Sequence, residues 1–418
     1  MQQLIINIGN LAGIREESTL LRGAALAELQ SINNAFLLIE NGLIKDFGGM
    51  QQLETENSIL KTKNQQSEII DANNSTILPC WVDSHTHLVF AESREEEFVD
   101  KIKGKTYAEI AAKGGGILNS ARKLNAASED ELFEKALRRL QELIELGTGA
   151  IEIKSGYGLT VEAELKMLRV IKRLKESANI PIKATFLGAH AYPEKYKDDH
   201  EGYIQLIINE MLPNIAAEKL ADYIDVFCEK GFFSVEEMIR VCEAGAKYGL
   251  KPKLHVNQLN SIGGVGAGIK VGAVSLDHLE TMTEKDIQLL SESDTIGTLL
   301  PTAAFFLRMQ YQPARQMIDS DCAIALASDY NPGSSPSGNM NFVVSLSCIQ
   351  MKMLPEEAIN AATINGAYAM GVQYEVGSIT IGKKANLIFT KPVSSITYLP
   401  YAFGSNLIER VMINGAFV

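Results

Sequence analysis

The sequence has few of the features that mark secreted, disulfide-rich or membrane-spanning proteins. It contains five cysteines among 418 residues, with no C-x-x-C pair. An odd number of scattered cysteines argues against a disulfide framework and favours buried free thiols in a reducing, cytoplasmic compartment. The chain also lacks an apolar run of about 18 residues, so no membrane span is expected. Its first residues, MQQLIINIGN, have no basic region, and we expect no signal peptide there.

Basic residues are also in the minority, with 39 Lys and Arg against 51 Asp and Glu, a formal net charge of −12. Without a basic patch to neutralise phosphates, we expect no nucleic-acid partner. A small anionic substrate remains compatible with this balance because it needs only one or two local cations. The chain is too long for one small core, which favours a large domain with a smaller companion.

What the sequence does contain is an alternation of apolar, β-branched runs with helical patterns. Eight runs are typical of strands: 77–85, 147–155, 182–190, 223–231, 251–259, 273–280, 295–302 and 322–329. Helices are expected between them, among others at 161–176, 234–248 and 283–292. Eight strands alternating with helices predict the α/β class and a parallel (β/α)8, TIM-like barrel.

The helix expected at 128–145 illustrates the pattern. Ser128 can cap its first turn, Glu131 can complete a capping box, and Gly147 follows its end. Its buried stripe should consist of Leu132, Ala136, Leu140, Leu143 and Ile144.

The two ends of the chain differ from this centre and consist of short strand-like runs. AFLLIENGLIKDFG predicts a hairpin turning at Asn41-Gly42, and residues 375–418 are again strand-like. Neither end is long enough for a stable sheet alone. We therefore expect both ends to form one small β-sandwich domain, from residues 1–75 and 371–418, with the barrel at 76–370.

Five of the six histidines lie where an apolar run gives way to polar residues. His85-Thr86-His87 forms an H-x-H unit, whose side chains share one face of a strand because strand side chains alternate. The others end later runs: His190, His255 and His278. Active sites of barrels gather at the carboxyl ends of the strands, where the eighth run supplies Asp329.

These residues predict one hydrolytic metal site. His85, His87 and His255 offer imidazoles and Asp329 offers a carboxylate, a donor set that suits one divalent metal ion, Zn²⁺ or Fe²⁺/Fe³⁺. Such an ion lowers the pKa of a bound water to about 7, which makes hydroxide available for hydrolysis at neutral pH.

Several strings resemble the amidohydrolase superfamily. These are WVDSHTHLVF, the later His…His…Asp series and the tail GSITIGKKANLIF, in which Asn386 stands where an acid is common. The strings EIKSGYGLT, TFLGAHAYP and SDYNPGSSP resemble a branch that opens a small cyclic amide carrying a propanoate. The resemblance covers nearly the whole chain and implies a homodimer.

It also implies roles for individual residues. Asp329 would move protons between the attacking water and the leaving nitrogen, and His278 would stabilise the oxyanion or share the proton transfer. Gln258 stands where some relatives carry an acid; since an amide accepts no proton at pH 7, it can only orient substrate or water. Residues implied to bind the anionic heterocycle are Arg94, Tyr107, Tyr157, His190, Gln258, Asn331, Gly333 and Ser334.

Alternatives remain open at this stage. The metal residues do not select the ring, so a deaminase or lactamase acting on another heterocycle fits, as does a metal-binding relative without turnover. Lys154 and Lys230 lie at strand ends, where some relatives bridge two metals through a modified lysine; we expect one metal and ion-pairing lysines. GGVGAG at 263–268 lacks nucleotide-loop spacing, and we expect a flexible or close-packed loop above the barrel there.

Overall fold

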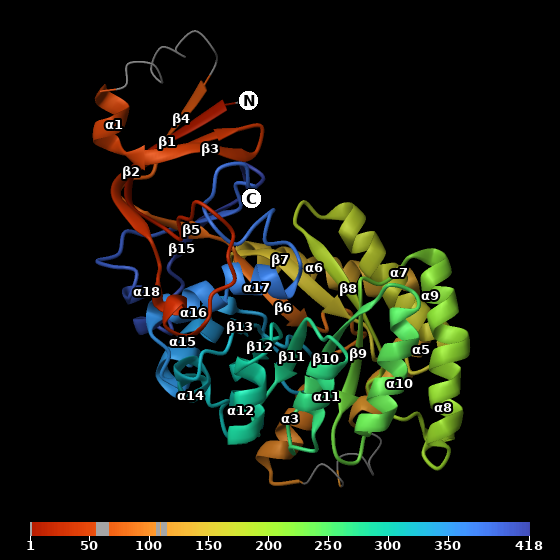
Figure 1. Ribbon diagram of the computed structural model, residues 1–418. Helices are drawn as coiled ribbons and strands as arrows, with labels where there is room; N and C mark the ends of the chain where they lie inside the picture. The colour runs from red at the N-terminus through yellow and green to blue at the C-terminus, as the bar shows by residue number, and fades with distance from the viewer. Residues whose placement is uncertain (1, 56–66, 106–108, 110–114) are drawn as a thin grey trace.

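The computed structural model describes residues 2–55, 67–105, 109 and 115–418, and its larger part is a barrel of parallel strands ringed by helices (Figure 1). Neighbouring strands pair in parallel and in chain order around the barrel. The strands are β6 (Trp81–Thr86), β7 (Thr148–Lys154), β8 (Ile182–Ala189), β9 (Tyr223–Cys228), β10 (Lys251–Val256), β11 (Ser275–His278), β12 (Ile296–Leu299) and β13 (Ile324–Leu326). The predicted (β/α)8 architecture is confirmed.

The seam between β6 and β13 is closed by residues just beyond the last strand. The N–H of Asp329 donates to the carbonyl of His85 at 3.0 Å, and the N–H of His87 donates to the carbonyl of Tyr330 at 2.9 Å. The buried Asp83 carboxylate accepts from both the N–H and the hydroxyl of Ser328. These bonds fix Asp329 beside the H-x-H unit.

Helices pack around the strands, and those predicted from sequence are present. The principal ones are α6 (Glu129–Glu145), α7 (Val161–Ser177), α8 (His200–Leu206), α9 (Leu212–Glu218), α10 (Val235–Ala246), α11 (Gly264–Lys270), α12 (Glu284–Ser291), α13 (Pro301–Leu307), α14 (Ala314–Asp319), α15 (Met340–Met351), α16 (Pro355–Ala361) and α17 (Ile364–Ala369). Two further helices, α3 (Glu95–Ile102) and α5 (Ile117–Ala126), lie between β6 and α6.

Helix α6 begins and ends as predicted, although two details differ. The Ser128 hydroxyl accepts from the N–H of Glu131, and Gly147 adopts a φ of 96° directly after the helix. The Glu131 carboxylate, however, accepts from Lys135 one turn later, so the expected capping box is replaced by an i,i+4 ion pair. Ile144 is half-buried at the edge of the apolar stripe rather than within it.

The GGVGAG segment is helical, which corrects the expectation of a loop. Gly264 and Gly268 belong to α11, and a Cβ at Gly268 would lie 2.5 Å from the Leu276 side chain. The glycines therefore allow the helix to pack closely against the strands beneath it.

Both ends of the chain join in a second sheet, which lies at one side of the barrel (Figure 1). Its strands are β1 (Gln2–Ala12), β2 (Ser31–Glu40), β3 (Leu43–Gly49), β4 (Ser67–Asp71), β5 (Thr76–Pro79), β14 (Leu387–Thr390), β15 (Ile408–Ile413) and β16 (Ala416–Phe417). Strands β2 and β3 form the predicted hairpin, with positive φ at both Asn41 and Gly42. The two-part β domain is confirmed, and its boundaries near residues 75 and 370 stay a prediction.

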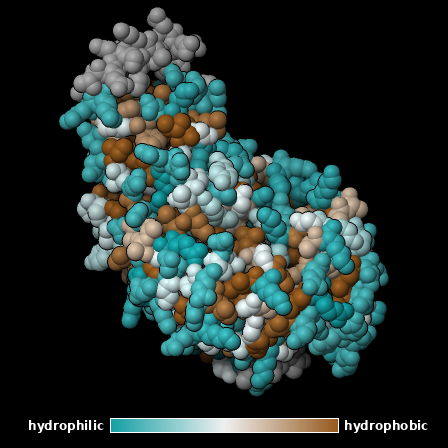
Figure 2. Space-filling model, in the orientation of Figure 1, coloured by the Kyte–Doolittle hydropathy of each residue, from teal (hydrophilic) through white to brown (hydrophobic). Residues whose placement is uncertain are grey.

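The remaining described elements are short: α1 (Met50–Thr55), α18 (Tyr398–Tyr401), the 3₁₀ helices Gly23–Ala27 and Glu194–Tyr196, and the π-helical turn Ile207–Met211, which connects α8 directly to α9. Hydrophilic side chains are spread over the visible face, with apolar patches between them (Figure 2). Within the described part of the chain, no helix combines the length and the apolar character that crossing a membrane requires.

Candidate metal and substrate site

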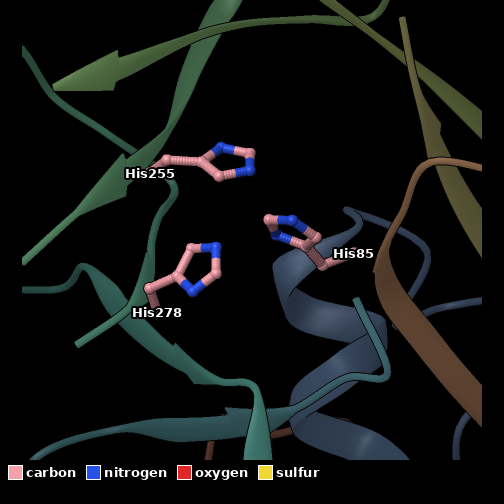
Figure 3. Close-up of side chains that lie close together, drawn as sticks. All are labelled: His85, His255 and His278. Carbon is pink, nitrogen blue, oxygen red and sulfur yellow. The ribbon is translucent and has the colours of Figure 1, made fainter. Parts of the chain in front are cut away.

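The histidines predicted from their strand ends converge inside the mouth of the barrel. The rings of His85, His255 and His278 are turned toward one another (Figure 3), and their potential ligand atoms lie within 4.8 Å of each other. A second group that meets the same criterion consists of His85, His87 and Asp329. His85, from β6, belongs to both groups and therefore lies at the centre of the cluster.

The cluster has the properties of a cation site. The Nε2 atom of His85 is buried and has no hydrogen-bond partner among the described residues. The same Nε2 lies 3.5 Å from the Asp329 carboxylate, as does Nε2 of His87. A buried polar atom without a partner costs about 1–3 kcal/mol, a penalty that a bound cation would remove. Imidazoles and one carboxylate are the donor set of hydrolytic divalent metal sites, so these residues fit such an ion.

Burial sets the protonation of these groups. Loss of water holds the pKa of His85, His87 and His255 well below the ordinary value, with Lys154 and the other imidazoles adding to the effect. The three rings are therefore neutral at pH 7 and can donate lone pairs. Burial also raises the pKa of Asp329 to about 7, and a nearby cation would lower it again.

His278 is different because it has an acidic neighbour. Burial alone would lower its pKa, but the Glu280 carboxylate, 3.4 Å from Nδ1, acts together with Asp329 and Asp277 to raise it. His278 and Asp329 both have left-handed backbones, with φ of 87° and 52°. Such conformations cost roughly 1–3 kcal/mol each in residues other than glycine and are concentrated at functional sites.

Two buried aspartates hydrogen-bond to the Nδ1 atoms of two of these imidazoles. Asp277 lies 2.7 Å from Nδ1 of His85, and Asp225 lies 2.8 Å from Nδ1 of His255. With Nδ1 engaged in this way, Nε2 of each ring is left for a metal, as is common in histidine–carboxylate pairs. Sequence reasoning missed both aspartates, although their position inside apolar strands was an available signal.

Lys154 lies in the same buried layer and pairs only with carboxylates among the described residues: Glu152, Asp225 and Asp277. Lys230 is exposed. A second buried lysine, Lys253, pairs with Glu152 at 2.5 Å. Sequence reasoning did not single out Glu152 or Lys253.

The residues predicted to contact substrate lie beside the histidines. The ring of His190 is 5.4 Å from that of His87 and 5.5 Å from that of Tyr157. The guanidinium of Arg94 lies 5.8 Å from the centre of the Tyr157 ring. Arg94 Nε donates to Ser120, and no hydrogen bond within the described residues holds its two terminal nitrogens, which suits a fork for a carboxylate.

The segment after Asp329 folds back on that residue. The Asn331 side chain donates to the Asp329 carbonyl at 2.6 Å and accepts from the N–H groups of Gly333 and Ser334. A Cβ at position 333 would lie 2.5 Å from Arg94 Nη1, so only glycine allows the arginine to approach this closely. The structure thus brings the Asn331–Ser334 segment to Arg94.

Of two further residues predicted to contact the substrate, the structure describes only Gln258. The Gln258 side chain is buried just after β10. Tyr107 lies outside the described residues.

Two further buried carboxylates, also missed from sequence, anchor the loops that carry these residues. Glu164 accepts from the N–H groups of Gly156, Gly158 and Leu159, on either side of Tyr157. Glu229 accepts from the N–H groups of Leu259 and Asn260, next to Gln258.

Comparison with known proteins agrees with this geometry. The profile of the amidohydrolase family matches residues 76–418. An imidazolonepropionase of Flavobacterium johnsoniae is 58% identical over 419 residues and covers 100% of both chains. One of Clostridium tetani is 44% identical over 397 residues, covering 95% of this chain and 93% of the relative. Guanine deaminase of E. coli is similar in fold, with a TM-score of 0.74 at 15% identity over 100% of this chain and 99% of that one.

Proposed function

This chain belongs to the amidohydrolase family and is a hydrolase, and from that premise we propose that it opens the cyclic amide of 4-imidazolone-5-propanoate to give N-formimino-L-glutamate, a step of histidine degradation. The observation that carries the proposal is the placement of Arg94 and Tyr157 beside the histidine–aspartate cluster. A hydrolytic centre and a carboxylate-binding cation are the two features that a heterocycle with a propanoate requires.

The metal ligands in this proposal are His85, His87, His255 and Asp329, holding one divalent ion. That ion would supply Lewis acidity and lower the pKa of a bound water. Zn²⁺ and iron both suit imidazole and carboxylate donors. Metal analysis of the purified protein should find one ion per chain, and two ions per chain would contradict the single-metal proposal.

Asp329 is the proposed proton carrier. Its carboxylate takes a proton from the water that attacks the ring carbonyl carbon and delivers it to the ring nitrogen as the carbon–nitrogen bond breaks. A carboxylate at this position lies 3.5 Å from Nε2 of both His85 and His87, and general acid–base help of this kind contributes about 10²- to 10⁴-fold. His278 hydrogen-bonds the developing oxyanion or shares in the proton transfer.

The remaining site residues bind the substrate. Arg94 pairs with the propanoate, while Tyr157 and His190 contact the ring. Gln258 orients substrate or water by hydrogen bonds. The Asn331–Ser334 segment, with Gly333, contacts the product, and Tyr107 is proposed as a further ring contact.

The decisive experiment incubates the purified protein with imidazolonepropionate and follows the loss of its ultraviolet absorbance. Because the substrate decays spontaneously, an enzyme-free reaction and an Asp329→Asn reaction serve as controls. Turnover above both controls is expected. Turnover of another heterocycle alone would favour a related deaminase or lactamase, and no turnover of any would favour a metal-binding relative without catalysis.

We further propose a cytoplasmic location and a homodimer. Five free cysteines support a reducing compartment. Resemblance to the family is the support for the dimer, and analytical ultracentrifugation would test it through the mass of the native particle.

A further inference from the structure

We propose that Lys154 is a positioning residue that holds two metal-binding imidazoles, His85 and His255, in a single joint arrangement. This inference rests on the proposed metal site and adds to it a residue that touches neither the metal ligands nor the substrate.

The evidence begins with shared atoms. Lys154 Nζ lies 2.9 Å from Oδ2 of Asp225 and 3.5 Å from Oδ2 of Asp277. The same Oδ2 atoms lie 2.8 Å from Nδ1 of His255 and 2.7 Å from Nδ1 of His85. One ammonium group therefore joins two histidine–aspartate pairs that come from different strands.

The negative charges of the two aspartates explain why a cation is needed between the two histidine–aspartate pairs. Asp225 and Asp277 have exposures of 1% and 0%, and like charges so deeply buried repel each other and lose their hydration. Lys154, itself fully buried, contacts both carboxylates, and its Nζ makes a third contact with Oε1 of Glu152 at 2.7 Å. Without this ammonium, the two carboxylates could separate or turn, and each would carry its imidazole with it.

Lys253 provides a matched comparison in the same layer. It is also fully buried, but its contacts are Glu152 and the backbone carbonyls of Ser84 and Ala369. Its ammonium makes no hydrogen bond or ion pair with Asp225 or Asp277 among the described residues. We expect its removal to change the charge of the layer by the same amount while the contacts of Lys154 with Asp225 and Asp277 remain.

The test measures zinc affinity by titrating the zinc-loaded protein with a chromogenic chelator, for the wild type, Lys154→Met and Lys253→Met. Loss of a group that holds metal ligands in orientation without binding the metal typically weakens metal affinity about 10- to 100-fold, and we expect a loss on this order for Lys154→Met. Lys253→Met should stay within about threefold of the wild type, because its ammonium contacts neither of the aspartates that hold His85 and His255.

A double-mutant cycle separates positioning from a general loss of structure. If Lys154 acts through Asp277, then Lys154→Met combined with Asp277→Asn should weaken zinc binding by less than the product of the two single effects. The cobalt-loaded Lys154→Met protein should also show an altered visible absorption spectrum, since the ligand arrangement has changed. Should Lys154→Met fail to fold, Lys154→Gln gives the same comparison with a neutral side chain of similar length.

The outcomes distinguish the inference from the proposed function. A wild-type protein that binds no metal would refute the metal site itself. Wild-type zinc affinity in folded Lys154→Met, or an equal loss in Lys253→Met, would overturn the role of Lys154 while leaving the metal site intact.

Discussion

Arg94 shows how a single side chain can determine which substrate a metal site accepts. Its guanidinium is held by Ser120 and lies over Tyr157, with terminal nitrogens available for a carboxylate. We expect Arg94→Lys to raise KM for imidazolonepropionate about 10-fold or more, because a charge-assisted hydrogen bond worth roughly 1.5–3 kcal/mol and the fork geometry are lost. Steady-state kinetics would measure this effect. The exposed Lys103, replaced by alanine, is the control, and an unchanged KM in Arg94→Lys would remove the clamp role.

Gln258 and Asp329 should separate binding from chemistry. The amide of Gln258 can orient but cannot accept a proton, so Gln258→Ala should mainly raise KM. Asp329→Asn should lower kcat by at least 10²- to 10⁴-fold, the usual contribution of a general acid–base group. Measuring kcat and KM for both variants tests the assignment. A Gln258→Ala enzyme with normal KM and no turnover would contradict it.

His190 makes a pH-dependent contribution to stability. Burial lowers the pKa of His190 to about 4 in the folded protein, below the ordinary histidine value of about 6.5. The unfolded chain therefore takes up this proton first, and the contribution to folding falls as pH drops from about 6.5 toward 4. Chemical denaturation of metal-free protein should show that His190→Asn loses less stability than the wild type over this range, by at most about 3 kcal/mol. Parallel pH profiles would show that His190 does not contribute.

Sequence periodicity could predict the histidines but not their supports. The H-x-H unit and Asp329 stand at strand ends, where side-chain alternation and barrel topology both apply. Asp225 and Asp277 carry charges inside strands, and Lys154 ends β7. Which groups these charges contact depends on which strands become neighbours. Only the closed barrel brings Asp277 of β11 to His85 of β6.

At the scale of elements, the site depends on loops held by buried acids. The Glu164 carboxylate, near the start of α7, accepts hydrogen bonds from three backbone N–H groups around Tyr157. In the same loop, the carbonyl oxygen of Gly156 lies 3.0 Å from Nδ1 of His190. An amide at position 164 has one acceptor oxygen, so Glu164→Gln leaves backbone donors unpaired. We expect KM to rise several-fold, with a smaller change in kcat.

The control for this loop variant is Glu162→Gln, which alters an exposed acid in the same turn of α7. Kinetics of both variants would isolate the anchoring of the loop from the helix-dipole effect of a lost charge. Equal KM values in the two variants would show that Glu164 does not position Tyr157.

Elements were predictable where local chemistry decides them. The hairpin at Asn41-Gly42 and the cap at Ser128 depend on residues close in sequence, and both formed as expected. The GGVGAG segment became helical because its glycines allow close packing against Leu276 and Val256, neighbours that lie outside the segment. Tertiary packing there overrides the weak helix propensity of glycine.

At the scale of the whole molecule, Asn386 joins the two sheets. Its side chain donates to the Gly149 carbonyl in β7 at 3.1 Å and accepts from the N–H of Asn414 at 2.8 Å. A carboxylate at this position could accept but not donate at neutral pH. The Asn386 amide can therefore make both hydrogen bonds at once and so connect the barrel to the domain formed by the chain ends.

The metal should stabilise the whole fold, because its proposed ligands come from β6, β10 and the segment after β13. An ion that binds only the folded state at about 1,000 times its Kd stabilises that state by about 4 kcal/mol. We expect a chelator to lower Tm by several degrees and added Zn²⁺ or Fe²⁺ to restore it, as differential scanning calorimetry would measure. Asp329→Asn, which removes one ligand, should show a smaller shift. If chelation left the wild-type Tm unchanged, the proposal that an ion ties these strands together would be wrong.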